Sequence, residues 1–114
     1  MEFKINNDTW TIVEKTKDQL KKIYEENMEE KAYFVFGVTK KAEHEIIINS
    51  DMCKEQKIRT LKHELTHCYM WEYGLYNAEP INEELVCDIV SASNDFINEV
   101  VNKWREYECK SEHK

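Results

Sequence analysis

The sequence predicts an α+β fold in which a small three-stranded sheet, containing a β-hairpin, is packed by three helices. Runs rich in β-branched and aromatic residues cover residues 10–14, 32–38 and 44–49, which favours strands. Apolar residues recur at helical spacing in an N-terminal, a central and a long C-terminal segment. A chain of 114 residues with two glycines, one proline and no linker tract is expected to form one domain over residues 1–114.

The N-terminal part is predicted to form a strand over residues 10–14 and then a helix over about residues 17–29. Thr16 and Gln19 have the spacing of a capping box, in which each side chain binds the other residue's backbone N–H. The apolar face of this helix consists of Leu20, Ile23, Tyr24 and Met28. We expect the helix to cover one face of the sheet.

Residues 32–38 and 44–49 are predicted to pair as a β-hairpin across the polar connection of residues 40–43. The second strand leads through two N-cap candidates, Ser50 and Asp51, into the central helix. A strand in this position is expected to form one wall of a cleft beside that helix. Its free edge is a candidate for holding an extended peptide by main-chain hydrogen bonds.

The central helix, over residues 58–73, carries the sequence His63-Glu64-Leu65-Thr66-His67. Its two histidines stand one turn apart on one face, where two imidazole nitrogens can bind one metal ion. Glu64 lies beside that face, so its carboxylate can serve as a general base toward a metal-activated water without being a ligand.

The opposite face of the central helix is apolar and consists of Ile58, Leu61, Leu65 and Cys68. Burial of this face would turn His63 and His67 outward into a cleft, and Gly74 is expected to end the helix. The alternative is that the histidines are surface residues of an ordinary amphipathic helix. The motif and its helical context together favour a metal site.

After a loop over residues 75–80, Asn82 is a candidate N-cap for a long helix that reaches about Tyr107. Its broad apolar face, interpreted as core, consists of Leu85, Val86, Ile89, Val90, Ala92, Phe96, Ile97, Val100, Val101 and Trp104. Glu84, Asp88 and Asp95 form an acidic stripe on the other side. A solvated face is the simpler interpretation of that stripe taken alone.

A catalytic zinc site takes three protein ligands and leaves one position for water, so the two histidines need a third ligand. A histidine six residues after His67 would complete one common pattern, but that position is Tyr73. The other common solution is a carboxylate from a following helix. Glu79, Glu83 and Glu84 are within reach.

Two segments resemble the gluzincin metallopeptidases, the thermolysin-like group, and especially its minimal single-domain members, the minigluzincins, which are similar to small proteins of phage and mobile elements. One is residues 63–67, and the other is residues 84–90, which is similar to the family's glutamate helix. The resemblance implies that Glu84 is the third zinc ligand and that Asp88 steadies His63. A ligand histidine needs such an acceptor for its second ring nitrogen.

Glu83 and Glu84 point about 100° apart on a helix, so only one of them can face the metal. Periodicity alone places Glu83 nearer the apolar face. In a cleft between two packed lobes, however, the ligand should project away from the helix's own core together with its acceptor partner. Glu84 with Asp88 fits this arrangement, whereas Glu83 with Cys87 does not, since a thiol is a poor acceptor.

Thermolysin-like enzymes hold the developing oxyanion with a later histidine and a tyrosine. Here the only histidine after the motif is His113, in the C-terminal tail. Tyr69, Tyr73 and Tyr76 are alternative donors, and the spacing does not choose among them.

The composition disfavours several other classes of function. A net charge of −7 and a pI near 5.1 provide no basic stripe for nucleic acid or an anionic membrane. The chain has no apolar run of membrane-spanning length and no signal-like N-terminus, so we expect a cytoplasmic protein. The four cysteines form no C-x-x-C pair and are expected to be free thiols.

The sequence therefore supports two hypotheses of different class. The first is a zinc-dependent metallopeptidase that acts on a peptide or protein substrate, with Glu64 as the general base and Zn²⁺ held by His63, His67 and Glu84. The second is a non-catalytic zinc-binding interaction protein. The intact Glu64 favours the first, because a structural site has no use for a carboxylate beside an open position.

Overall fold

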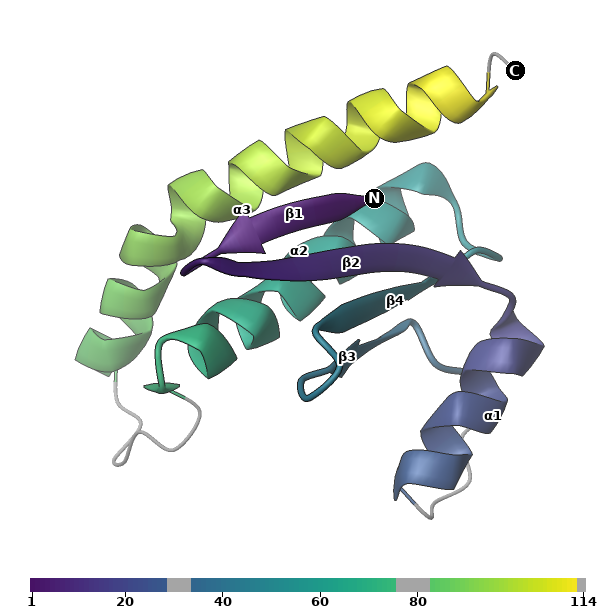
Figure 1. The fold of residues 1–114 in the computed structure, drawn as a ribbon, viewed down its shortest axis with the longest axis horizontal. Helices are drawn as coiled ribbons and strands as arrows, with labels where there is room; N and C mark the ends of the chain where they lie inside the picture. Colours follow the sequence, from purple (N-terminus) through teal and green to yellow (C-terminus); the bar gives the residue numbers. More distant parts are fainter. Residues whose placement is uncertain (29–33, 76–82, 113–114) are drawn as a thin grey trace.

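The computed structural model describes residues 1–28, 34–75 and 83–112, which form one four-stranded sheet and three helices (Figure 1). The strands are β1 (Glu2–Ile5), β2 (Asp8–Lys15), β3 (Gly37–Lys40) and β4 (Glu45–Asn49). The helices are α1 (Lys17–Met28), α2 (Lys54–Glu72) and α3 (Glu83–Glu112). The predicted α+β class is confirmed, whereas the prediction of three strands is wrong.

The additional strand is β1, which pairs with β2 as a hairpin. Its turn residues, Asn6 and Asn7, have φ values of 49° and 69°. Two consecutive positive φ angles suit the right-handed twist of a two-residue hairpin, and asparagine tolerates this conformation. Phe3 and Ile5 are buried by the pairing. The alternation of polar and apolar residues that marks this strand covers only four residues, which is why the sequence interpretation missed the strand.

The strand order is β1-β2-β4-β3, with β2 and β4 parallel and the other pairs antiparallel. The hairpin of β3 and β4 is confirmed, but β3 begins only at Gly37, residues 34–36 lie outside a strand, and residues 32 and 33 are not among those described. β4 lies between β2 and β3. The expectation that this strand has a free edge is therefore wrong, since the edge strands of the sheet are β1 and β3.

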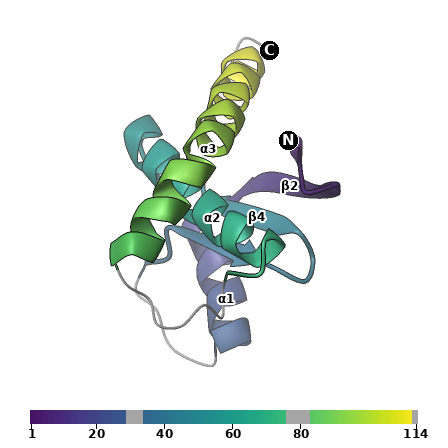
Figure 2. The ribbon, with the colours of Figure 1, turned by 90° about the vertical axis from the view of Figure 1, so that its left-hand side faces the viewer.

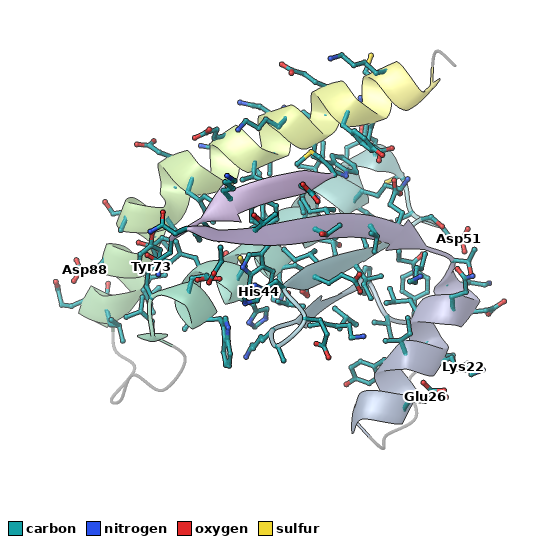
Figure 3. The ribbon with its side chains drawn as sticks, viewed as in Figure 1. Lys22, Glu26, His44, Asp51, Tyr73 and Asp88 are labelled. Carbon is teal, nitrogen blue, oxygen red and sulfur yellow. The ribbon has the colours of Figure 1, made fainter. Side chains whose placement is uncertain are left out.

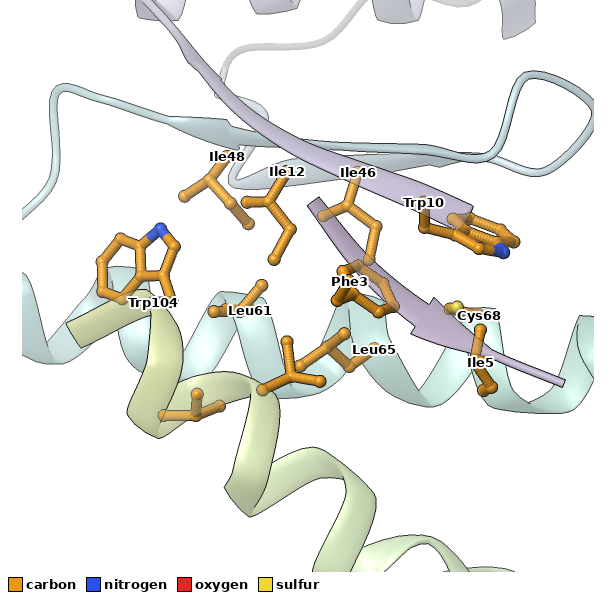
Figure 4. Packing of buried hydrophobic residues seen from close by; sticks show 12 residues of the cluster. Phe3, Ile5, Trp10, Ile12, Ile46, Ile48, Leu61, Leu65, Cys68 and Trp104 are labelled. Carbon is orange, nitrogen blue, oxygen red and sulfur yellow. The ribbon is translucent and has the colours of Figure 1, made fainter. Parts of the chain in front are cut away.

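The helices cover both faces of the sheet. Ile47 points to α1, where it packs with Leu20 and Val35, so the prediction that the first helix covers one face is confirmed. Ile46 and Ile48 point to the other face. There the larger core, shown in Figure 4, consists of Phe3, Ile5, Trp10, Ile12, Ile46, Ile48, Leu61, Leu65, Cys68, Val100, Val101 and Trp104.

The start of α1 has the predicted capping box. The Thr16 N–H donates to Gln19 Oε1 at 3.0 Å, and the Gln19 N–H donates to Thr16 Oγ1 at 3.3 Å. The prediction that Ser50 or Asp51 caps the motif helix is wrong, because the N-cap of α2 is Cys53. Asp51 Oδ2 instead accepts from the Lys17 N–H at 2.8 Å. The parallel pairing of β2 and β4 brings these two chain segments together.

Helix α3 extends past the predicted end at Tyr107 to Glu112, and its predicted N-cap lies outside the described residues. Its buried hydrophobic residues are Val100, Val101 and Trp104, and Phe96 and Ile97 pack against the same core. The prediction that most of the apolar face is core is wrong for the start of the helix, because Val86 is 46% and Val90 60% exposed. Figure 1 shows the reason: the first turns of α3 extend beyond the tip of the β1–β2 hairpin.

The motif helix agrees with its prediction. Leu61, Leu65 and Cys68 are fully buried, and Gly74, with a φ of 71°, follows the end of α2. Helices α2 and α3 pack against each other, and Figure 2, turned by 90°, shows that they cross. Within the described ranges, no helix combines the length and apolar character needed to cross a bilayer.

Candidate metal centre

His63 and His67 lie one turn apart on the exposed side of α2, opposite the buried face of the helix. Their Nε2 atoms are 3.2 Å apart. Two nitrogens bound tetrahedrally to one zinc at 2.0–2.1 Å would be about 3.3 Å apart. The pair therefore fits the spacing of two zinc ligands. Burial, with the charges of His63 and Lys41, lowers the pKa of His67 and favours the neutral imidazole that binds metal.

Glu64 completes a group with the two histidines, whose ligand atoms all lie within 4.8 Å of one another. Its side chain is buried, and Oε2 accepts a hydrogen bond of 3.1 Å from Thr39 Oγ1. Burial raises the pKa of Glu64, while the charge of His63 and the bond from Thr39 oppose this rise. A buried carboxylate with a raised pKa is suited to act as a general base.

Gly37 allows the edge strand β3 to lie close to α2. A Cβ at this position would lie 2.8 Å from Thr60 Cγ2, 3.0 Å from the Ile47 carbonyl oxygen and 3.2 Å from Glu64 Cγ. Only a residue without a side chain permits this approach, which brings Thr39 within reach of Glu64. The sequence interpretation missed both Gly37 and Thr39. A glycine inside a strand pattern was the available signal.

Two cavities meet at the motif, since Tyr24, Gly37 and Glu64 line both of them. The first, of about 570 Å³, is lined further by Phe34, Val35, Phe36, Gln56, Arg59, Thr60 and His63. The second, of about 410 Å³, is lined further by Val38, Thr39, Lys40, Lys41, Glu43 and His67. The motif thus faces a cleft between α2 and β3. One side of the cleft carries the aromatic side chains of Phe34 and Phe36, and the other carries two lysines.

The predicted third ligand lies elsewhere in this structure. Glu83, Glu84 and Asp88 are exposed on the first turns of α3, and none belongs to the donor group of the histidines. Figure 3 places Asp88 at the outer end of that helix. Glu79 lies outside the described residues. The roles of Glu84 and Asp88 remain predictions.

Of the tyrosines considered for the oxyanion, the two described ones, Tyr69 and Tyr73, do not line these two cavities. Tyr69 packs against Tyr73 and Phe96, with ring centroids 4.7 and 6.3 Å apart. Tyr76 and His113 lie outside the described residues. Tyr24 and Lys41, which sequence spacing did not identify, do line the cleft. They come from α1 and from the turn after β3, so no local pattern relates them to the motif.

The four cysteines are free, and only Cys68 is buried. None of them belongs to the donor group at the histidines.

Comparison of the chain with models of known protein families, with curated proteins and with solved structures gives no match. The resemblance of residues 63–67 and 84–90 to the gluzincins therefore remains a prediction from the sequence.

Proposed function

We propose that this protein is a zinc-dependent metallopeptidase of the gluzincin type, which hydrolyses peptide bonds in a peptide or protein substrate. The main support is the position of Glu64. This buried carboxylate is held by Thr39, lies beside two histidines with zinc-ligand spacing, and lines both cavities of the cleft. A purely structural zinc site needs no such group.

His63 and His67 hold the zinc, with Glu84 as the third ligand implied by the family resemblance. When bound, the zinc supplies Lewis-acid polarisation of the scissile carbonyl and a water of lowered pKa. Glu64 takes the proton from the attacking water and passes it to the leaving amine. The hydrogen bond from Thr39 to Oε2 fixes the carboxylate, so that Oε1 remains for this transfer.

The edge strand β3 provides a place for the substrate backbone. Its partner on one side is β4, and among the described strands nothing pairs with its other edge. An extended peptide can add to such an edge by main-chain hydrogen bonds. Because Gly37 keeps β3 against α2, a peptide on this edge passes Glu64, and its side chains reach the two cavities.

The alternative is a zinc-binding interaction protein that does not cut its partner. The aromatic side of the cleft favours it, because Phe34 is 42% and Phe36 is 52% exposed, and exposed aromatic side chains are common in binding surfaces. The same side chains also suit a substrate pocket. The two functions differ in whether a bound peptide is hydrolysed.

The deciding experiment is digestion of a peptide library by the zinc-loaded protein, with and without a chelator, followed by mass spectrometry. We expect chelator-sensitive cleavage, and we expect His63→Ala or His67→Ala to remove one tightly bound zinc equivalent together with activity. Peptide binding without any cleavage would support the interaction protein instead. Cleavage that persists in the chelator would contradict the proposed mechanism.

A further inference from the structure

A second group of metal-donor side chains lies at the end of α2, about 7.5 Å along the helix axis beyond His67. It consists of Asp8 at the start of β2, His44 in the turn between β3 and β4, and Glu72, the last residue of α2. Their ligand atoms all lie within 4.8 Å of one another. Figure 3 labels His44 in that turn. We propose that these three residues bind a second divalent cation of the zinc or manganese type.

The group has an excess of negative charge. The side chain of Glu72 is only 4% exposed. Its Oε1 accepts a hydrogen bond of 2.6 Å from Trp10 Nε1, a neutral donor that does not cancel the charge. Asp8 adds a second carboxylate, and the C-terminal end of α2 adds the negative pole of the helix dipole. A buried carboxylate is costly unless a cation compensates it.

The protein's own cations supply little of this compensation. In the described part of the chain, no lysine or arginine forms an ion pair with Asp8 or Glu72. Among the described residues, the basic group in contact with Glu72 is His44, whose Nε2 is 3.9 Å from Oε1. Neutral imidazole carries no charge but is a good metal ligand. A divalent cation would balance both carboxylates and use the histidine in its neutral form.

The donor atoms of the group suit zinc or manganese. One imidazole nitrogen and two carboxylate oxygens provide three protein ligands, as in many zinc sites, and leave a position for water. Calcium and magnesium prefer all-oxygen sites, so the histidine favours zinc or manganese. The ligand atoms lie within 4.8 Å of one another, and ligands of one zinc lie about 3.3 Å apart, so a bound cation would draw them closer together.

Neighbouring groups hold the donors in place. The ring of His44 stacks on Trp10, with centroids 4.8 Å apart and planes 13° apart, and the same tryptophan holds Glu72. The His44 carbonyl oxygen accepts from the Thr11 N–H at 3.0 Å. Such supporting contacts orient metal ligands. The cation would tie the β3–β4 turn and the start of β2 to the end of the motif helix.

The test uses the full chain with His63→Ala and His67→Ala, so that the first site is removed, and with its exposed cysteines alkylated. Bound metal and thermal stability are measured during titration with Zn²⁺ and, separately, Mn²⁺. We expect one bound equivalent and a rise in Tm of at least about 5 °C once the free metal is roughly 100-fold above its Kd. Adding Asp8→Asn and His44→Gln should abolish both effects, whereas the matched control Glu43→Gln, exposed in the same turn as His44, should not.

Absence of metal binding in the His63→Ala/His67→Ala protein would overturn the proposal, as would binding that survives Asp8→Asn with His44→Gln. If the protein is instead stabilised at low pH by protonation of His44, without bound metal, the cluster binds a proton rather than a metal ion. That result would also overturn the proposal. X-ray absorption of the zinc-loaded His63→Ala/His67→Ala protein needs no further substitution. We expect a shell of nitrogen and oxygen only, and sulfur in that shell would contradict the assignment.

Discussion

Thr39 on the edge strand and Glu64 on the motif helix are joined by a hydrogen bond of 3.1 Å, although they are 25 residues apart in the sequence. The same Thr39 hydroxyl lies 3.3 Å from the Glu64 carbonyl oxygen. One strand residue therefore positions both the side chain and the backbone of the proposed general base. This contact links the edge strand proposed to bind substrate to the proposed general base.

Thr39→Val should move the acidic limb of the pH profile of kcat/KM to higher pH. The hydrogen bond lowers the pKa of Glu64, so its loss leaves the effect of burial less opposed and raises that pKa further. The pH profile of kcat/KM, measured on the zinc-loaded protein, tests this shift. Thr66→Val is the control, because the Thr66 hydroxyl donates to the Lys62 carbonyl oxygen instead. An unchanged acidic limb would show that Thr39 does not tune the base.

Glu64→Gln should keep zinc while lowering hydrolysis by roughly 10²–10⁴-fold, because it deletes the base and spares the ligands. It should also stabilise the metal-free protein at neutral pH, because burial raises the pKa of Glu64 and so disfavours its charged form. Glu106→Gln, on an exposed part of α3, is the control. Unaltered hydrolysis by Glu64→Gln would refute the mechanism.

The sign of that stability change follows from the raised pKa of Glu64. Because the folded chain holds this proton more tightly than the unfolded chain, the carboxyl group favours folding at low pH. This contribution is lost as the pH rises through the folded pKa. Denaturant titrations from pH 4 to 8 should therefore show a smaller loss of stability with pH in Glu64→Gln than in the wild type, both without metal.

Gly37→Ala should destabilise the fold by about 1–3 kcal/mol, because the added Cβ meets a methyl group and a backbone oxygen that have little room to move. Activity should fall as β3 is pushed from α2. Thermal unfolding and hydrolysis measure the two effects, and Thr60→Ser should restore part of both by removing the nearer methyl group. Gly74→Ala is the contrast: its positive φ makes alanine strained, but nothing lies within 4 Å, so activity should persist.

Glu84→Gln should weaken zinc binding at the histidine site by well over tenfold and Asp88→Asn by about 10–100-fold, if the family resemblance holds. Glu83→Gln is the matched control and should have little effect, because adjacent helix residues point in different directions. Competitive chelator titration gives the affinities. A larger effect of Glu83→Gln would show that the register of this helix was misinterpreted, and with it the role of Asp88.

Thiol labelling of the native protein should modify Cys53, Cys87 and Cys109 quickly and Cys68 only after unfolding. Burial, with a contribution from Glu72, raises the pKa of Cys68 and keeps its thiol protonated. The number of fast-reacting and slow-reacting thiols is measured from the absorbance change on reaction with an aromatic disulfide reagent, with and without denaturant. The Cys68→Ser variant should lose only the slow class. Four fast thiols would contradict the packing of α2 against the sheet.

The sequence by itself determined the features that depend on neighbouring residues. The capping box at the start of α1 follows from a spacing of three residues, and the outward face of His63 and His67 follows from a spacing of four. The burial of Leu61 and Leu65 follows from the same periodicity. These patterns repeat within one or two helical turns, so the backbone geometry of a single element fixes them.

Only the tertiary structure decided which distant residues meet. The parallel pairing of β2 and β4 leaves β3 as an edge strand and brings Asp51 to the start of α1. The contact of β3 with α2 brings Thr39 to Glu64, and the turns at the other end bring Asp8 to Glu72. Strand order results from the burial of both faces of the sheet, and this burial depends on residues that are far apart in the sequence. No short stretch of sequence encodes it, because it depends on elements that lie tens of residues apart.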